Sequence, residues 1–401
     1  MEHGIAQKSY LLALLEKWVA FESVTPDQTA CQQDIADNLR SMGFCVDLWQ
    51  DNGVNNLWAT LGSNNPDFVF VGHTDVVPAG QGWQTSPFKV SYLDNRVMGR
   101  GVADMKGGIA AFMAAMRLVY DDQQKLPSMG IMLTGDEEGP ATYGTVSIIK
   151  AIADKMQSIK YVLIAEPTAE EKTGDTIKVG RRGSLHLGFN IHYPGKHIAY
   201  AQYEDNLLHR LSKVLSACEN KKWDQGYPEF PETGMQVYEL NATSIAENVT
   251  ASEAKLRLNF RFNPASNPDS LLAQMIEMIE AEHLNIVDTN VSCSGMPFYS
   301  PQGPLRQCLQ SAICQVTGKK ANISTGGGTS DGRFLASEGV EIIELGLPRR
   351  SIHQANESVS MTDLVELMQI FESVLRSLMD VSLSELAAQS QPNQQAGMHH
   401  G

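Results

Sequence analysis

The chain has 401 residues, with 31 Lys and Arg against 46 Asp and Glu, so its formal net charge is −15. A content of 42% hydrophobic and 19% charged residues is ordinary for a globular protein and excludes wholesale disorder. At about 100–200 residues per domain, we expect two or three domains. The acidic balance argues against a nucleic-acid partner, because the phosphate backbone is bound by basic faces.

No apolar run reaches the roughly 18–20 residues that cross a bilayer. The apolar segment YLLALL near the N-terminus is interrupted by Glu16 and Lys17 and lacks the cleavage site of a signal peptide. Six cysteines are spread along the chain without a CxxC pair, so neither a disulfide framework nor a thiolate zinc site is expected. Buried, reduced thiols and a cytoplasmic location without membrane contact are the expectation.

The first 180 residues alternate between helical and strand patterns. Apolar residues recur at helical spacing before Met42, and the glycine- and alanine-rich segment 105–120 predicts a helix that packs closely on a sheet. Between these helices and after them, short and almost wholly apolar runs predict strands buried on both faces. They are DFVFVGHTD (67–75), GIMLTGDEEG (130–139, ending in acids) and YVLIAEPT (161–168). Apolar strands that alternate with helices indicate an α/β domain with a central mixed, mostly parallel sheet.

A different pattern follows. The segments 184–193 and 255–262 alternate apolar and polar residues with period two, which predicts half-exposed antiparallel strands. A helix at 303–318 and a buried strand at 340–346 then return to the earlier pattern, so we expect an inserted α+β domain. The expected division is a first domain at 1–182 and 297–387, an inserted domain at 183–296, and a polar, disordered tail at 388–401.

Acids and histidines follow the predicted buried strands. Ligand sites of open α/β sheets lie at the carboxyl ends of the strands, so these side chains should converge. Histidine, aspartate and glutamate without cysteine suggest a divalent ion, Zn²⁺ above all. The residues at or near the strand ends are His73, Asp75, Asp104, Glu137, Glu138, Glu166 and His353.

Charge arithmetic favours two ions over one. Two divalent ions bring +4, the carboxylates of Asp104, Glu138 and Glu166 bring −3, and one hydroxide completes neutrality. Each residue alone also has an ordinary explanation, since a strand-end histidine can be a hydrogen-bonded surface residue and an aspartate can be a turn or N-cap residue. The number of such residues at strand ends is what supports a metal site.

Several motifs resemble the dizinc amidohydrolases, a family that includes aminoacylases, acetylornithine deacetylases, glutamate carboxypeptidases and succinyl-diaminopimelate desuccinylases. The similarity runs from about Leu11 to Leu378, and three of the motifs, GRRGS, NFRF and GGTSDGRF, resemble the desuccinylase branch most. The motifs are GHTDVVPAG (72–80), GRGVADMKGG (99–108), DEEGPAT (136–142), AEPT (165–168), IKVGRRGSL (177–185), NVTASEAKLRLNFRF (248–262), GGTSDGRF (327–334) and IHQANE (352–357).

The resemblance implies a dizinc-peptidase-like catalytic domain with two Zn²⁺ per subunit, for which Co²⁺ is a possible substitute. One ion would be held by His73 and Glu166, the other by Glu138 and His353, and Asp104 would bridge both. In this reading Asp75 accepts the outer N–H of His73, which fixes the tautomer of the imidazole. Glu137 would be the general base that activates the water and later protonates the leaving amine.

By the same resemblance, the inserted domain is a lid and dimerisation module of a homodimer. His197 would reach the partner subunit's site and stabilise the oxyanion. Without the resemblance His197 would be an exposed loop histidine, and Arg261 a plain exposed charge. The positions that match substrate-carboxylate binding in the family are Arg181, Ser184, Tyr200, Asn248, Arg261 and Thr329.

The chain departs from the desuccinylase pattern at two places. At Ala201 and Gln202 those enzymes usually have Pro and His, and at Arg349 they usually have Asn. An arginine four residues before His353 predicts an extra partner for a substrate carboxylate near the metals, unless it faces solvent. Substrate identity is therefore the open question.

The resemblance implies hydrolysis of N-succinyl-LL-2,6-diaminopimelate to succinate and LL-2,6-diaminopimelate. Two alternatives stand beside it. One is a deacylase or carboxypeptidase that acts on another acidic N-acyl amino acid. The other is a non-catalytic, metal-containing binding protein, against which an intact Glu137 argues, since binding alone needs no general base.

Overall fold

A computed structural model describes residues 2–380 and Leu383. These residues divide into two compact units. The first comprises those up to 179, those from 300 to 324 and those from 330 on, and the second comprises 180–299 and 325–329. The predicted tail at 388–401 lies outside the described residues. Within them, no helix has the length and apolar character that crossing a membrane requires.

The first unit is built on an eight-stranded sheet with strand order β1-β2-β6-β3-β7-β16-β8-β15. Four neighbouring strands, β6, β3, β7 and β16, run parallel, whereas β1 and β2 are antiparallel at one edge. The predicted mixed, mostly parallel sheet is therefore confirmed. Its strands are β1 (Cys45–Asp51), β2 (Val54–Leu61), β3 (Phe68–His73), β6 (Met129–Thr134), β7 (Tyr161–Ile164), β8 (Thr176–Lys178), β15 (Asn322–Ser324) and β16 (Glu341–Glu344).

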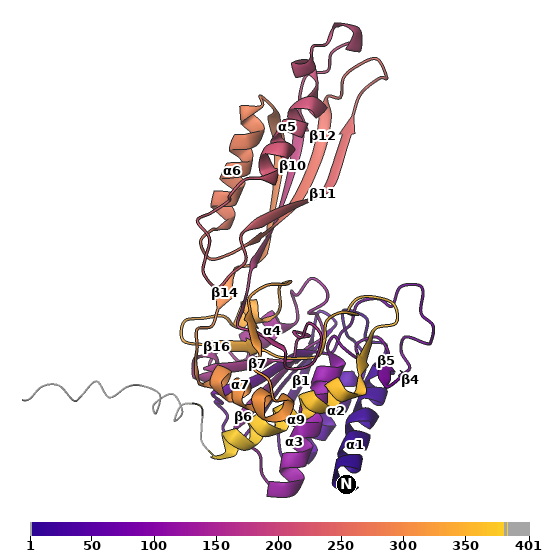
Figure 1. The fold of residues 1–401 in the computed structure, drawn as a ribbon, viewed down its shortest axis with the longest axis vertical. Helices are drawn as coiled ribbons and strands as arrows, with labels where there is room; N and C mark the ends of the chain where they lie inside the picture. Colours follow the sequence, from indigo (N-terminus) through magenta and orange to yellow (C-terminus); the bar gives the residue numbers. More distant parts are fainter. Residues whose placement is uncertain (1, 381–382, 384–401) are drawn as a thin grey trace, which may run out of the picture. The chain divides into compact units, whose positions relative to one another are not determined.

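Helices cover this sheet, and Figure 1 shows three of them, α1, α3 and α9, alongside one another. Phe112 of α3 stacks on Phe70 of β3 with ring centroids 3.7 Å apart, and Phe371 of α9 meets both rings edge-on. A small antiparallel sheet joins β4 (Ser91–Leu93), β5 (Arg96–Met98) and β17 (Ser358–Ser360). The helices are α1 (Glu2–Val19), α2 (Cys31–Ser41), α3 (Lys106–Gln123), α4 (Thr145–Ala151), α7 (Pro304–Thr317), α8 (Gly332–Leu335) and α9 (Met361–Asp380).

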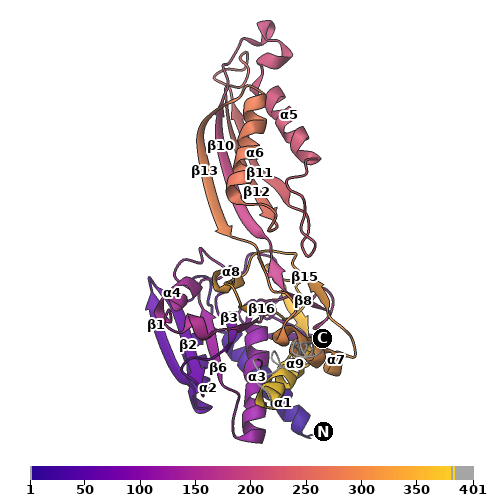
Figure 2. The same ribbon diagram turned by 90° about the vertical axis from the view of Figure 1, so that its left-hand side faces the viewer.

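The second unit is a four-stranded antiparallel sheet, in the order β11-β12-β10-β13, with two helices on one face (Figure 2). Asn267 caps the second of these helices by accepting the N–H of Ser270, and Pro268 occupies its first turn. The elements are β10 (Gly183–His192), β11 (Gly234–Thr243), β12 (Glu253–Phe262), β13 (Asn285–Gly295), α5 (Leu207–Glu219) and α6 (Pro268–Ala281), with the short pair β9 (Gly180–Arg181) and β14 (Phe298–Tyr299).

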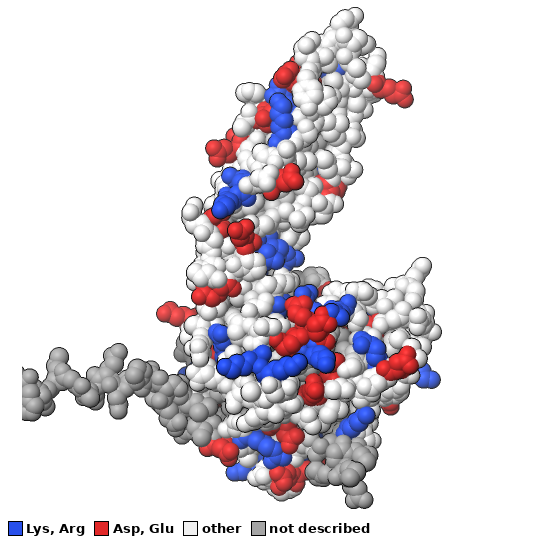
Figure 3. Space-filling model, in the orientation of Figure 1, with Lys and Arg blue, Asp and Glu red and all other residues white. Residues whose placement is uncertain are grey.

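Acidic and basic side chains are intermixed on the face of the molecule shown in Figure 3. Ion pairs on the surface of the chain include that of Arg376 with Asp122, at 2.7 Å. This face lacks the continuous basic surface that a nucleic acid would need. The cysteines are unbonded, but Cys45, Cys293 and Cys314 are exposed, so the expectation that the thiols are buried is wrong for these three.

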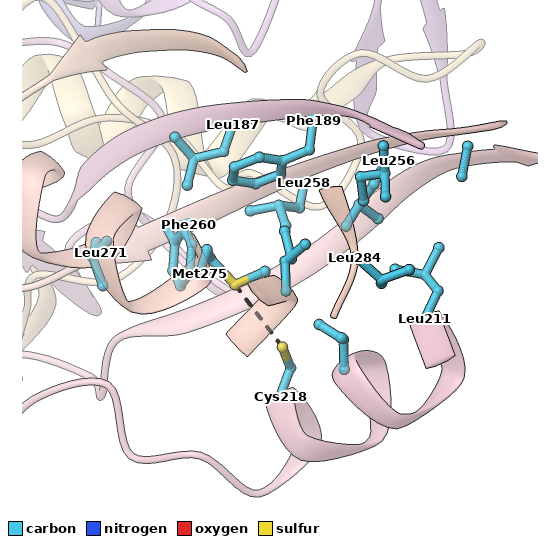
Figure 4. Packing of buried hydrophobic residues seen from close by; sticks show 14 of the residues in the cluster. Leu187, Phe189, Leu211, Cys218, Leu256, Leu258, Phe260, Leu271, Met275 and Leu284 are labelled. Carbon is cyan, nitrogen blue, oxygen red and sulfur yellow. Dashed lines mark hydrogen bonds between the residues drawn. The ribbon is translucent and has the colours of Figure 1, made fainter. Parts of the chain in front are cut away.

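The period-two segments form the antiparallel strands β10 and β12, and their apolar residues face the helices. Leu187 and Phe189 of β10 are buried beside Leu258 of β12, as Figure 4 shows. The helices close this core, where Cys218 Sγ lies 4.0 Å from Met275 Sδ. Alternation with period two therefore builds a sheet that is apolar on one face only.

Glycine allows α3 to approach the end of β7 closely. A Cβ at Gly108 would lie 2.7 Å from the carbonyl oxygen of Ala165 and 2.9 Å from its Cβ. On another side of the same segment, a Cβ at Gly346 would lie 2.3 Å from the carbonyl oxygen of Glu166. The main chain at Ala165 and Glu166 is thus held between two glycines, and this fixes where the Glu166 side chain begins.

We predict that Gly108→Ala lowers the free energy of unfolding, although alanine is the better helix former by about 1 kcal/mol. The added methyl group meets a main-chain oxygen that cannot move aside, and overpacking typically costs about 1–3 kcal/mol. Urea unfolding measures the change. The control is Gly234→Ala, where a Cβ meets nothing within 4 Å. A Gly108→Ala protein as stable as this control would disprove the close approach.

Candidate metal centre

Three adjacent parallel strands deliver the predicted residues to one edge of the sheet. His73 is the last residue of β3, Glu137 and Glu138 follow β6, and Glu166 follows β7 by two residues. Asp104 comes from the turn before α3, and its side chain joins this edge. The convergence expected at the carboxyl ends of the strands is what the structure has.

Two histidine–carboxylate groups share Asp104. In the first, His73 Nε2 lies 3.1 Å from Asp104 Oδ1 and 3.6 Å from Glu166 Oε1. In the second, His353 Nε2 lies 3.3 Å from Asp104 Oδ2 and 2.9 Å from Glu138 Oε1. Each group gathers one imidazole nitrogen and two carboxylate oxygens, and the two groups use different oxygens of Asp104.

The surroundings of His73 select its tautomer. Its Nδ1 lies 2.9 Å from the main-chain oxygen of Asp75, which can only accept a hydrogen bond. Nδ1 therefore carries the proton in the neutral ring, and the lone pair of Nε2 points toward the carboxylates of Asp104 and Glu166. A lone pair that faces two carboxylates needs either a proton or a metal ion between them. The donor set thus fits a divalent metal ion at each imidazole.

The carboxylate of Asp75 also holds a neighbouring loop, and its predicted role toward His73 stays a prediction. It lies 3.6 Å from Nδ1 of His73, farther than the main-chain oxygen of the same residue. Its two oxygens accept the main-chain N–H groups of Glu137, at 3.2 Å, and Glu138, at 3.0 Å. Asp75 therefore ties the loop after β6 to the loop after β3.

The electrostatics favour cations at both imidazoles. Hydrogen bonds with Asp104 and Glu138 raise the pKa of His353 to about 10. Burial opposes the charge of His73, but the hydrogen bond with Asp104 and the carboxylates of Asp75 and Glu166 raise its pKa well above 6.5. Burial also opposes the charge of Asp104, yet its hydrogen bonds with the two imidazoles hold its pKa well below the usual range.

Glu137 differs from its neighbour Glu138. Burial, and next the negative charge of Glu166, raise the pKa of Glu137 well above 4.5. Its carboxylate lies within 4.8 Å of ligand atoms of both His73 and Glu166. A carboxylate with a raised pKa beside a metal-type donor set has the properties of a general base.

The remaining predicted residues lie in the second unit, except for Arg349, and form two groups there. Ser184 of β10 is the strand partner of Arg261 on β12, and Arg181 donates to the main-chain oxygen of Gly328, next to Thr329. In the other group, His197 Nε2 lies 3.3 Å from the side-chain amide nitrogen of Asn248, and the rings of His197 and Tyr200 are 5.3 Å apart. Their substrate roles stay predictions.

Arg349 is engaged by a neighbouring acid. Its guanidinium donates three hydrogen bonds, of 2.6–3.1 Å, to the carboxylate of Glu170. The adjacent Arg350 pairs with Glu171. A substrate carboxylate would have to compete with Glu170 for Arg349, so the predicted binding role of Arg349 stays a prediction that gains no support from its contacts.

Sequence reasoning missed the residues that hold the ligand-bearing loops. Glu357 and Arg100 form an ion pair of 2.7 Å in which both side chains are buried. Lys106, also buried, donates to the main-chain oxygens of Trp18, in the last turn of α1, and Phe21, which follows α1. The first pair lies inside two quoted motifs, GRGVADMKGG and IHQANE, so a search for charged residues near the predicted ligands could have found it.

We predict that metal removal destabilises the protein and that Asp104 carries most of the effect. Zn²⁺ at a free concentration 100-fold above its dissociation constant should raise the free energy of unfolding by about 2.7 kcal/mol over chelated protein. Asp104→Asn should remove most of this gain, because both groups use Asp104. Asp363→Asn is the control, since Asp363 is a buried carboxylate that accepts from Thr173 and Ser360 instead. If Zn²⁺ raises the free energy of unfolding of Asp104→Asn as much as that of the wild type, the proposed metal site is excluded.

Comparisons with known proteins agree with this geometry. The model of peptidase family M20/M25/M40 matches residues 69–377. A succinyl-diaminopimelate desuccinylase of Hydrogenovibrio crunogenus is 41% identical over 376 residues, which are 92% of this chain and 99% of that protein.

Solved structures share the fold at low identity. An M20 family metallo-carboxypeptidase from Sulfolobus solfataricus has a TM-score of 0.73 and 14% identity, and the match covers 92% of this chain and 99% of that chain. A dinuclear metal-binding M20 peptidase of Bacillus subtilis has a TM-score of 0.67 and 11% identity, covering 94% and 99%. The chain therefore belongs to peptidase family M20/M25/M40 and is a metal-dependent amide hydrolase.

Proposed function

We propose that the chain hydrolyses N-succinyl-LL-2,6-diaminopimelate to succinate and LL-2,6-diaminopimelate, a step of diaminopimelate and lysine biosynthesis. The observation that carries the proposal is the pair of histidine–carboxylate groups joined by Asp104, in a chain that shares nearly its whole length with desuccinylases. The proposed place of the reaction is the cytoplasm, where unbonded cysteines are the rule.

Two Zn²⁺ ions fit the donor set best, because imidazole with carboxylate suits zinc, and Co²⁺ can take the same ligands. His73 and Glu166 would hold one ion, Glu138 and His353 the other, and Asp104 both. When bound, such ions polarise the amide carbonyl and lower the pKa of water. The main-chain oxygen of Asp75 keeps the imidazole of His73 oriented for this task.

Glu137 moves the proton. Its carboxylate takes a proton from the attacking water and gives it to the nitrogen of the leaving diaminopimelate, so the amide bond breaks without release of a free amide anion. The raised pKa of Glu137 suits the first half of this task, because a carboxylate with a raised pKa accepts a proton more readily than an ordinary one.

Recognition of the acyl amino acid falls to the second unit in this proposal. The guanidinium groups of Arg181 and Arg261 can bind carboxylates through two hydrogen bonds each. Ser184, Tyr200, Asn248 and Thr329 would supply further hydrogen bonds. The unit would also act as a lid and as the dimerisation module of a homodimer.

His197 would serve the partner subunit's site. Its Nδ1 accepts the N–H of Ala199 at 3.2 Å, and the side-chain amide nitrogen of Asn248 lies 3.3 Å from Nε2, so Nε2–H could donate to a substrate oxygen only in place of this contact with Asn248. An N–H donor of this kind stabilises the negative oxygen that develops at the attacked carbonyl. Support for the role is the exposed position of the loop, which leaves the imidazole accessible.

A panel of N-acyl amino acids tests the substrate, with Glu137→Gln as the control. We expect succinate release from N-succinyl-LL-2,6-diaminopimelate at a kcat/KM well above those for N-acetyl and dipeptide analogues. Glu137→Gln should lower kcat by about 10²–10⁴-fold and keep the wild-type metal content, because only the proton carrier is lost. Preference for another acidic N-acyl substrate would support the alternative function, that of a deacylase or carboxypeptidase acting on that substrate. No turnover of any member would support a binding protein.

A mixing experiment tests the shared site. We predict that His197→Ala lowers kcat by about 10²–10³-fold, the usual effect of losing one oxyanion donor. When it is mixed with Glu137→Gln, about a quarter of the wild-type rate should return, since about half of the dimers are then mixed and each has one whole site. If the two variants exchange subunits but the mixture stays inactive, each subunit works alone.

A further inference from the structure

One buried carboxylate outside the ligand set is surrounded by donors. The side chain of Glu357 is fully buried. Its Oε2 accepts from the guanidinium of Arg100 at 2.7 Å and from the N–H of Gly101 at 3.0 Å. Its Oε1 accepts from the N–H groups of Ala103, at 2.8 Å, and Asp104, at 3.1 Å. Four donors around two oxygens match an ionised carboxylate, which can only accept.

Three of these donors are main-chain N–H groups of the short segment 101–104, whose last residue is Asp104. Residues 101–104 curl around the carboxylate, so the backbone of Asp104 is fixed on one side by Glu357 while its side chain reaches His73 and His353 on the other. The direction in which Asp104 presents its two oxygens therefore depends on Glu357.

Arg100 extends the connection to a second loop. Its Nη2 lies 3.3 Å from the main-chain oxygen of Pro78 and 3.2 Å from that of Ala79, in the segment that follows His73 and Asp75. Its guanidinium also lies 5.3 Å from the ring centre of Trp83. Arg100 is itself almost fully buried, so these contacts are shielded from water.

The third loop is the one that carries Glu357 itself. His353 lies four residues earlier, and the main-chain oxygen of Glu357 accepts the N–H of Gly99 at 3.0 Å. His353 and Asn356 have positive φ angles of 61° and 62°, which turn the short loop back toward residue 99. One ion pair thus joins the loops that carry His73, Asp104 and His353.

We propose that Glu357, with Arg100, is a positioning residue of the metal centre: it sets the relative placement of three ligand-bearing loops and so determines metal affinity and coordination geometry. The proposal rests on the proposed metal ligands and is independent of which acyl substrate is cleaved. The competing explanation is a buried ion pair that supports only the stability of the fold. Partners behind metal ligands typically contribute 10–100-fold in metal affinity.

Glu357→Gln is the test, because the amide keeps the shape but turns a donor toward main-chain N–H groups. The matched control is Glu341→Gln. Glu341 is also a buried carboxylate that accepts two main-chain N–H groups, from Leu305 and Arg306, but it begins β16, at the edge of the sheet opposite to the ligands. Both variants should lose thermal stability.

Two readouts separate positioning from stability. Zn²⁺ affinity, measured against a competing chelator, should fall by about 10–100-fold in Glu357→Gln and by less than about 2-fold in Glu341→Gln. The visible absorption of the Co²⁺ protein should change in Glu357→Gln alone, since it reports ligand geometry. Equal affinities and equal Co²⁺ spectra in the two variants would overturn the proposal.

Glu357→Gln leaves the cation of Arg100 buried without its partner, which can prevent folding. The double variant Arg100→Met/Glu357→Gln removes this charge and should fold better while it still binds Zn²⁺ about 10–100-fold more weakly than wild type. A double variant with wild-type Zn²⁺ affinity would overturn the proposal. If the wild-type protein binds Zn²⁺ normally but does not cleave the succinyl substrate, this result counts against the proposed function alone.

Discussion

The sharing of Asp104 between two imidazoles is the interaction on which the rest of this structure depends. It requires three carboxylates to lie within 3.6 Å of one or both of two imidazoles, although like charges repel. Parallel strands solve the placement by ending at one edge, and main-chain N–H groups hold the loops: those of Glu137 and Glu138 bind Asp75, and those before α3 bind Glu357. The protein thus fixes a set of charges whose stable form includes cations.

Glu137 and Glu138 are adjacent residues of the same type, yet their side chains have different surroundings. Both follow β6, and both main-chain N–H groups bind the same carboxylate, so the residues are fixed as a pair. Glu138 then meets the imidazole of His353 at 2.9 Å, whereas the half-buried Glu137 meets the negative charge of Glu166. One carboxylate is thereby suited to a cation and the other to a proton.

Periodicity predicted the strands well, because buried parallel strands and half-buried antiparallel strands impose different hydrophobic patterns. The ends of β3, β6 and β7 then located the ligand candidates, while their separate metal roles came from family resemblance. The hydrogen-bond and ion-pair partners of individual side chains were less predictable from the sequence. The acceptor for His73 Nδ1 is mainly a main-chain oxygen, which no residue type reveals. Arg349 meets Glu170 across 179 positions, and Glu357 meets Arg100 across 257, so only the folded chain brings these charges together.

These pairings bear on where acyl selectivity can arise. Arg349 and Arg350 both lie on the loop before His353, yet Glu170 and Glu171, which follow Glu166 closely, engage both guanidinium groups. Exposed ion pairs of this kind contribute little stability. A substrate carboxylate that displaced one of them would nevertheless lie beside the freed carboxylate of Glu170 or Glu171, and the two negative charges would repel each other. A dicarboxylic acyl group would therefore have to compete with Glu170 and Glu171 for the arginines next to the ligand histidine.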